Sequence, residues 1–334
     1  MKLALALALS ATPALAADAP SPGEIVAAAP AAEWVAIAAE DLLVMTLAPD
    51  AKGRARRVVI QLMPAPFSQG WVGNIRKLAG AHWWDGTAVT RVQDNYVAQW
   101  GDPDGEDAAK AKPLPAGLRT MVEQDYAQRT DVVDAHCRPI GKCVLWGEPR
   151  VSHAASDSYA QLAGFAKGWP VAGLRPSKAE IKALGKPTEG LGVMAESWPI
   201  HCYGMVGDGR NLSPDTGTGA ELYAVIGHAP RHLDRNIALV GRVVEGIEHL
   251  SSLPRGTGAL GVYETAAERT AIVSIRLASD LPAGERPRFE YLSTEGPAFA
   301  RYAEARANRR DAFFITPAGG ADVCNVPVPV RRAK

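Results

Sequence analysis

The sequence predicts a mainly β protein whose strands either close into a barrel or pack as a sandwich. Short runs rich in β-branched and aromatic residues recur along the chain, separated by turns that contain glycine or proline. Few stretches show the apolar spacing of a helix, and this combination is typical of barrels and sandwiches. The predicted strands are 42–47, 57–62, 88–92, 96–99, 222–226, 237–240 and 271–277.

One helix is predicted between the second and third of these strands. Phe67, Trp71, Ile75 and Leu78 recur at the spacing of a single apolar stripe on a helix. A proline precedes this stripe and Gly80 follows it, which are typical start and stop signals. We therefore expect a helix over 67–80.

The rest of the chain divides by composition. Residues 18–39 are rich in alanine and proline and are predicted to be a linker, before a domain at 40–281. The stretch 104–199 has scattered helical patterns and is predicted to be a mixed insertion packed on that domain. Within it, a capping box predicts a helix from Ser177 to Gly185, and Tyr159, Leu162 and Phe165 share the face of another. A C-terminal extension, 282–334, carries a predicted helix at 297–308.

The N-terminus predicts export. Residues 1–17 combine one lysine, a short apolar run and a small-residue end, as a secretory signal peptide does. An alanine-rich, weakly ordered N-terminus is the alternative. Nothing downstream is long and apolar enough to cross a bilayer, so we expect a soluble periplasmic or secreted chain. Lys+Arg and Asp+Glu number 36 each, which excludes charge-driven binding to nucleic acid.

Four cysteines follow the signal peptide, and an even number in an exported chain favours disulfides over free thiols. Three pairings are possible, and the sequence alone does not choose among them. We favour Cys137–Cys143, which are close in sequence, together with Cys202–Cys324, which would tie the C-terminal extension to the barrel. The spacing does not match a CxxC redox motif or a zinc site.

The block 84–103 reads WDGTAVTRVQDNYVAQWGDP and resembles the cyclophilin signature. Other pieces resemble the same family in the same order: 58–62, the helix bearing Asn74, 219–223 and 233–246. The resemblance covers about residues 40–103 and 200–280. It implies a closed antiparallel cyclophilin-like β-barrel capped by two helices, and the activity of a peptidyl-prolyl cis/trans isomerase on Pro-containing or unfolded polypeptides.

By this resemblance, Arg91 is the catalytic donor. It would stabilise the twisted amide, in which the prolyl nitrogen regains a lone pair. The residues expected to bind the substrate are Tyr96, Val97, Gln99, Tyr223, Leu233 and His232. Without the resemblance, Arg91 would be an exposed strand residue and the apolar positions would be core. No cofactor or metal is required, and a monomer is expected.

Several positions depart from the family pattern. Tyr96 and Tyr223 stand where phenylalanine is usual, and each adds a hydroxyl that must find a partner. Trp100 replaces a glycine and is expected to place bulk near the active site. Glu221 replaces a glutamine and Ile237 a histidine, while His232 stands where tryptophan is common.

Two alternative interpretations remain open. His228, His232 and Asp234 could hold a metal, although a proline between the histidines makes a loop at the rim of the site the better interpretation. The whole chain could also be a cyclophilin-shaped binding or chaperone module with little or no turnover. Retention of Arg91 and Gln99 favours the enzyme.

Overall fold

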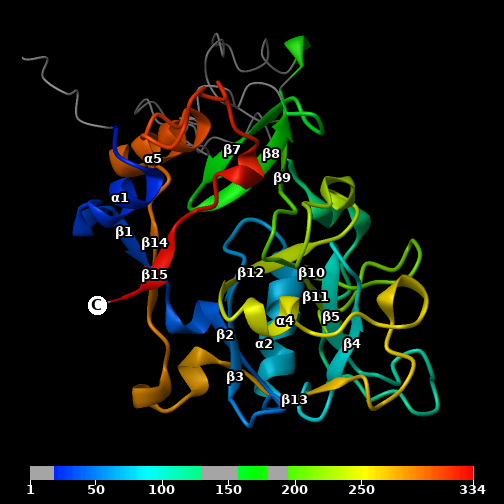
Figure 1. Cartoon of the computed structure of the whole chain (residues 1–334). Coiled ribbons are helices and arrows are strands. Elements are labelled where there is room, and N and C mark those ends of the chain that lie inside the picture. The colour runs from blue at the N-terminus through cyan, green and yellow to red at the C-terminus, as the bar shows by residue number, and fades with distance from the viewer. Residues whose placement is uncertain (1–18, 130–156, 176, 180–194, 334) are drawn as a thin grey trace, which may run out of the picture.

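Eight antiparallel strands close into a barrel, which forms the lower half of Figure 1. The computed structural model describes residues 19–129, 157–175, 177–179 and 195–333. The order of strands around the barrel is β10-β11-β5-β4-β13-β2-β3-β12. Their bounds are β2 Leu42–Leu47, β3 Arg56–Leu62, β4 Ala88–Val92, β5 Val97–Gly101, β10 Met205–Asp208, β11 Leu222–Val225, β12 Leu239–Glu245 and β13 Thr270–Leu277. The predicted mainly β fold and closed barrel are confirmed.

Two helices pack on the barrel. Helix α2 (Gln69–Gly80) places Trp71, Ile75 and Leu78 in the barrel core, as the predicted stripe requires. The short α4 (Glu248–Ser251) adds Leu250 to the same core. These elements provide the two expected helices.

The insertion forms a four-stranded sheet with the order β6-β9-β8-β7, at the top of Figure 1. Its strands are β6 Gln128–Arg129, β7 Leu162–Ala166, β8 Trp169–Leu174 and β9 Glu196–Pro199. Trp169, Val171 and Trp198 belong to the same hydrophobic cluster as the barrel interior. The described part of the insertion therefore shares one core with the barrel.

The predicted helix through Tyr159, Leu162 and Phe165 is wrong. Leu162 and Phe165 lie in β7, which pairs with β8 through a tight turn at Lys167 and Gly168, both with positive φ. Every residue of β7 is buried, and a short run that is buried on both faces lacks the alternation that identifies a strand. The helix predicted from Ser177 lies mostly outside the described residues.

The segment 18–39, predicted to be a linker, also differs. It contains helix α1 (Pro22–Ala27) and strand β1 (Trp34–Ala36). Ser21 and Glu24 form a capping box, and a proline occupies the first turn, where its missing N–H is harmless. The proline that suggested a linker therefore starts a helix.

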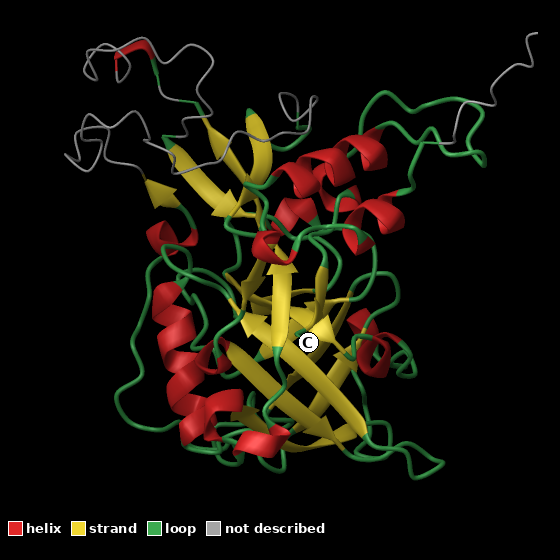
Figure 2. Ribbon diagram, turned by 90° about the vertical axis from the view of Figure 1, so that its left-hand side faces the viewer, coloured by secondary structure: helices red, strands yellow, loops and turns green. Residues whose placement is uncertain are grey.

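The C-terminal extension packs with the N-terminal segment that contains α1 and β1. Strands β14 (Phe289–Leu292) and β15 (Val330–Arg332) form a sheet with the order β1-β14-β15. Helix α5 (Pro297–Ala307) confirms the predicted helix and packs on α1 beside the inserted sheet (Figures 1 and 2). Short 3-10 turns are η1 Ala31–Glu33, η2 Ala39–Asp41, η3 Glu123–Tyr126, η4 Arg231–Leu233, η5 Ala259–Gly261, η6 Ala278–Asp280, η7 Ala283–Glu285 and η8 Val323–Asn325.

One disulfide ties the extension to the barrel region. Cys202 and Cys324 are bonded with a Cα–Cα distance of 5.2 Å, as predicted. Cys137 and Cys143 lie outside the described residues, so their pairing stays a prediction.

Candidate active site

The turn before β4 fixes the strand that carries Arg91. The hydroxyl of Thr87 donates to the carbonyl of Trp84 at 2.7 Å, and the indole of Trp84 donates to the Ala220 carbonyl at 2.8 Å. Asp85 forms a two-bond ion pair with Arg276 at 2.6 and 2.7 Å. These contacts tie the start of β4 to the neighbouring strand β13 and to the segment just before β11.

Arg91 lies half-buried on β4 and faces Gln99 across the strand pair. Its Nη1 donates to Gln99 Oε1 at 3.1 Å and its Nε to the Leu260 carbonyl at 2.7 Å, while Nη2 donates to Gln93. Burial lowers the pKa of Arg91, and the nearby Tyr96 and Glu221 oppose that shift. An arginine stays cationic at physiological pH, so the site holds a fixed positive charge.

Glu221 completes a chain of polar contacts with Gln99. Gln99 Nε2 donates to Glu221 Oε1 at 2.6 Å. Burial raises the pKa of Glu221, and the hydrogen bond from Gln99 acts in the opposite direction. Arg91, Gln99 and Glu221 are therefore connected by hydrogen bonds into one network.

Apolar and aromatic side chains surround this network. Val97, Tyr223 and Val225 form a small cluster, with Tyr96, Leu233 and Ile237 packed against it. The guanidinium of Arg91 lies 5.7 Å from the centre of the Tyr96 ring, and Tyr96 stacks on His232 with 6.4 Å between ring centres. We call the seven predicted site residues the Arg91 cluster: Arg91, Tyr96, Val97, Gln99, Tyr223, Leu233 and His232.

The structure brings all seven of these residues together. His232 is exposed, whereas Tyr223 is only 4% exposed. Trp100, in contrast, is fully buried in the barrel core. The expectation that it crowds the active site is therefore wrong, because alternate residues of a strand point to opposite faces.

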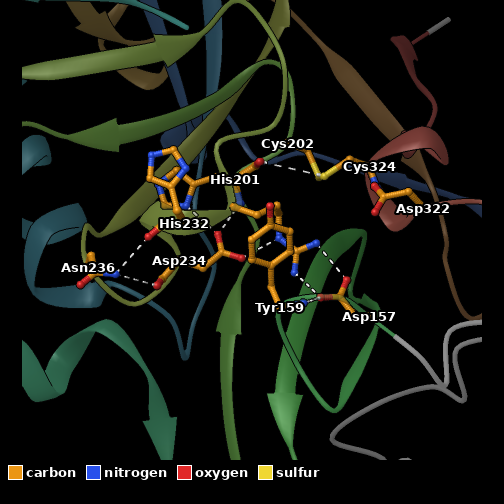
Figure 3. Close-up of polar contacts among 10 residues, drawn as sticks. Asp157, Tyr159, His201, Cys202, His232, Asp234, Asn236, Asp322 and Cys324 are labelled. Carbon is orange, nitrogen blue, oxygen red and sulfur yellow. Dashed lines mark hydrogen bonds and ion pairs between the residues drawn. A yellow bond between two sulfur atoms is a disulfide. The ribbon is translucent and has the colours of Figure 1, made fainter.

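The Tyr223 hydroxyl meets a residue that the sequence did not single out. Its oxygen lies 2.9 Å from Nε2 of His201, a fully buried histidine. His201 Nδ1 lies 2.8 Å from Asp234 Oδ1 (Figure 3). The available signal was the tyrosine itself, because a buried hydroxyl needs a partner.

The metal interpretation does not fit this geometry. Asp234 accepts hydrogen bonds from Arg231 and from the backbone of His201, while His232 stacks on Tyr96. Within the described ranges, no three His, Cys, Asp or Glu side chains are grouped as metal ligands.

The barrel fold, with a half-buried arginine beside a cluster of aromatic and apolar side chains from neighbouring strands and the turn η4, defines a cyclophilin-like class of protein. The sequence agrees, because residues 55–276 match the family described as "Cyclophilin type peptidyl-prolyl cis-trans isomerase/CLD". The chain belongs to this family of peptidyl-prolyl cis-trans isomerases. The matched residues lie within the predicted domain at 40–281.

The fold is similar to that of a solved cyclophilin structure. The crystal structure of cyclophilin AquaCyp293 from Hirschia baltica is 23% identical, with a TM-score of 0.62, and the match covers 90% of this chain and 94% of that one. A cyclophilin-type peptidyl-prolyl cis-trans isomerase of Cryptosporidium parvum matches at 10% identity and a TM-score of 0.38, over 71% and 96% of the two chains. Among curated proteins, no sequence matches.

Proposed function

We propose that this isomerase accelerates rotation about X-Pro bonds in exported polypeptides, with Arg91 as the catalytic donor. The observation that carries the proposal is the arrangement of the Arg91 guanidinium, which Gln99 and the Leu260 carbonyl hold beside the Tyr96 ring. In this proposal, the apolar members of the Arg91 cluster grip the proline ring, and Arg91 and Gln99 face the amide.

The chemistry follows from amide resonance. The barrier to rotation is ~18–20 kcal/mol because the C–N bond has partial double-bond character. That character is lost in the twisted transition state, where the prolyl nitrogen becomes a hydrogen-bond acceptor. A donor aimed at this nitrogen binds the transition state more tightly than either planar ground state, which lowers the barrier. A guanidinium suits this role because it is always charged and its donors form a rigid fork.

Substitution of Arg91 tests the proposal. Loss of a charge-assisted bond worth roughly 3 kcal/mol predicts that Arg91→Ala lowers kcat/KM by ~100-fold. A protease-coupled assay on a short X-Pro peptide measures this. Arg91→Lys should not restore the rate, since a point charge on a flexible stem does not reproduce the fork.

The matched control is Arg54→Ala, which removes an exposed arginine from a surface ion pair with Asp50. It should leave the rate unchanged. If Arg91→Ala isomerises the peptide as fast as the wild type, the catalytic role of Arg91 is wrong. If the wild type binds the peptide but does not isomerise it, the protein is the binding module considered in the sequence analysis.

Export is the second part of the proposal. Its support is the sequence pattern of residues 1–17, which lie outside the described residues. The mature protein is expected to begin at Ala17 or Asp18. Mass spectrometry of the native protein checks this, and an intact Met1 would remove the assignment to the periplasm or the medium. In the described part of the chain, no helix is both long and apolar enough to cross a membrane.

A further inference from the structure

One buried imidazole connects the two segments that carry Tyr223 and Leu233 of the Arg91 cluster. Tyr223 comes from β11, and Leu233 comes from the turn η4. His201, between β9 and β10, contacts Tyr223 through Nε2 at 2.9 Å and Asp234, the residue after Leu233, through Nδ1 at 2.8 Å. The His201 and Tyr223 rings are also stacked, with centres 6.3 Å apart. The His201 side chain therefore contacts both Tyr223 and the turn that carries Leu233.

The chemistry of Asp234 fixes the direction of one of these two hydrogen bonds. The Asp234 carboxylate is an acceptor, so Nδ1 of His201 carries the proton that it receives. Nε2 and the Tyr223 hydroxyl share the second hydrogen bond, in which a hydroxyl is able to donate or to accept. The backbone N–H of His201 donates to the same Asp234 oxygen at 3.0 Å. Both ring nitrogens of this buried imidazole have a partner, so the position of the Tyr223 oxygen is held by His201.

The turn that carries Leu233 also has contacts with residues other than His201. The other oxygen of Asp234 accepts from Arg231 Nε at 2.7 Å. Arg231 donates two further bonds to Asp157, at 2.9 and 2.8 Å, and both side chains are almost fully buried. Asp157 precedes β7 of the inserted sheet (Figure 3). The turn that carries Leu233 is thus fixed both to His201 and to the insertion.

We propose that His201 is a positioning residue for substrate binding, which holds the Tyr223 ring through its hydroxyl and the Leu233 turn through Asp234. This inference rests on the proposed function, because it takes Tyr223 and Leu233 as the residues that grip proline. His201 does not touch the reacting amide. Its loss should therefore weaken the binding of the peptide and leave the chemistry of Arg91 in place.

The test separates KM from kcat for an X-Pro peptide, with peptide affinity measured in parallel by titration. His201→Leu removes both side-chain hydrogen bonds and should raise KM and the dissociation constant by roughly ten-fold or more, with little change in kcat. His201→Gln should recover most of the binding, because its amide offers one donor and one acceptor. His249→Gln, a half-exposed histidine on α4, is the matched control and should behave as wild type.

Tyr223→Phe keeps the ring and removes only the hydroxyl, so it should raise KM by roughly five- to ten-fold. The double variant with His201→Leu should have a KM close to that of His201→Leu alone, since both changes remove the same Tyr223–His201 hydrogen bond. A KM and an affinity within about two-fold of wild type in folded His201→Leu would overturn the inference. If His201→Leu does not fold, the Tyr223→Phe variant provides the test, and an unchanged KM in that variant would also overturn the inference.

The two proposals fail differently. Failure of the positioning role leaves the loss of kcat in Arg91→Ala intact. Failure of the catalytic role leaves the affinity measurements on the His201 variants to decide the positioning role. If the wild type does not bind the peptide at all, both proposals are wrong.

Discussion

Gln99 donates to Glu221 at 2.6 Å and accepts from Arg91 at 3.1 Å, and these two partners determine which way its amide points. An arginine offers only donors, so the amide oxygen must face Arg91, and the amide nitrogen is left for Glu221. A carboxylate at position 221, where the family usually has glutamine, can only accept when it is ionised. It therefore favours the orientation of Gln99 that supports Arg91.

Burial of Glu221 has a pH-dependent consequence for stability. Because burial raises its pKa, the folded protein binds this proton more tightly than the unfolded chain, and stability falls as pH rises from the ordinary carboxyl pKa through the raised one. Glu221→Gln removes that loss. The variant should therefore gain stability over wild type as pH rises through this window, with little difference below it.

Denaturant unfolding at several pH values measures this difference. Burial also raises the pKa of Asp208, and the charge of Glu221 adds to that shift. Glu221→Gln therefore also reduces the loss of stability that Asp208 causes, and this second effect has the same sign. A difference in stability that stays constant with pH would contradict the prediction.

At the level of single residues, the resemblance of 84–103, of 219–223 and of the stretch around 233 predicted which residues lie together in the Arg91 cluster. Local strand geometry explains this success, because Arg91 and Gln99 are register partners on adjacent strands. His201 could not be found in the same way. Its two partners lie 22 and 33 residues further along the chain, and only the fold brings the three together.

Strand β10 contains a close approach that only glycine allows. Gly207 is the register partner of Tyr223, and a methyl group at 207 would collide with the Tyr223 ring and hydroxyl. The hydroxyl is bonded to His201, so the ring is not free to move away. The missing side chain at 207 therefore makes room for the larger residue at 223.

Gly207→Ala should consequently destabilise the protein by about 1–3 kcal/mol, the usual penalty for overpacking a core. Unfolding by urea measures the change. Gly73→Ala in helix α2 is the matched control, because nothing lies within 4 Å of the added methyl. Alanine in a helix interior is expected to be neutral or slightly stabilising there. Equal effects at the two positions would show that the Tyr223 contact is not the cause.

The amphipathic period of α2 predicted that helix, and residue composition predicted strands such as β2 and β11, which are buried almost throughout. Helix α2 followed from its apolar stripe, whereas β7 has no exposed face to create an alternation. The sequence of α1 is too short to show a period, and its packing depends on α5, at the other end of the chain. These errors therefore reflect tertiary burial that local patterns do not report.

For the whole molecule, the Cys202–Cys324 bond closes the longest covalent loop seen among the described residues, with a sequence separation of 122. A cross-link over a loop of this size stabilises the fold mainly by restricting the unfolded chain, typically by about 2–4 kcal/mol. The double variant Cys202→Ala, Cys324→Ala should lose stability by this amount. Denaturant unfolding under oxidising conditions checks the loss.

Reductant provides the control for that experiment. It should lower the stability of the wild type towards that of the double variant. Any response of the double variant itself measures what Cys137 and Cys143 contribute. A double variant as stable as the oxidised wild type would contradict the prediction.

The sheet β1-β14-β15 joins the two ends of the described chain, since Trp34 pairs with Leu292 and Tyr291 pairs with Val330. β1 is made long before its partner β14 and before β15, which lie about 250 residues or more further along the chain. Until then, Trp34 and the apolar face of α1 have no place to pack. This unit cannot assemble during translation in the order in which it is made. It must wait until β14 and β15 have been made, while the barrel strands β2 and β3 can already pair with each other.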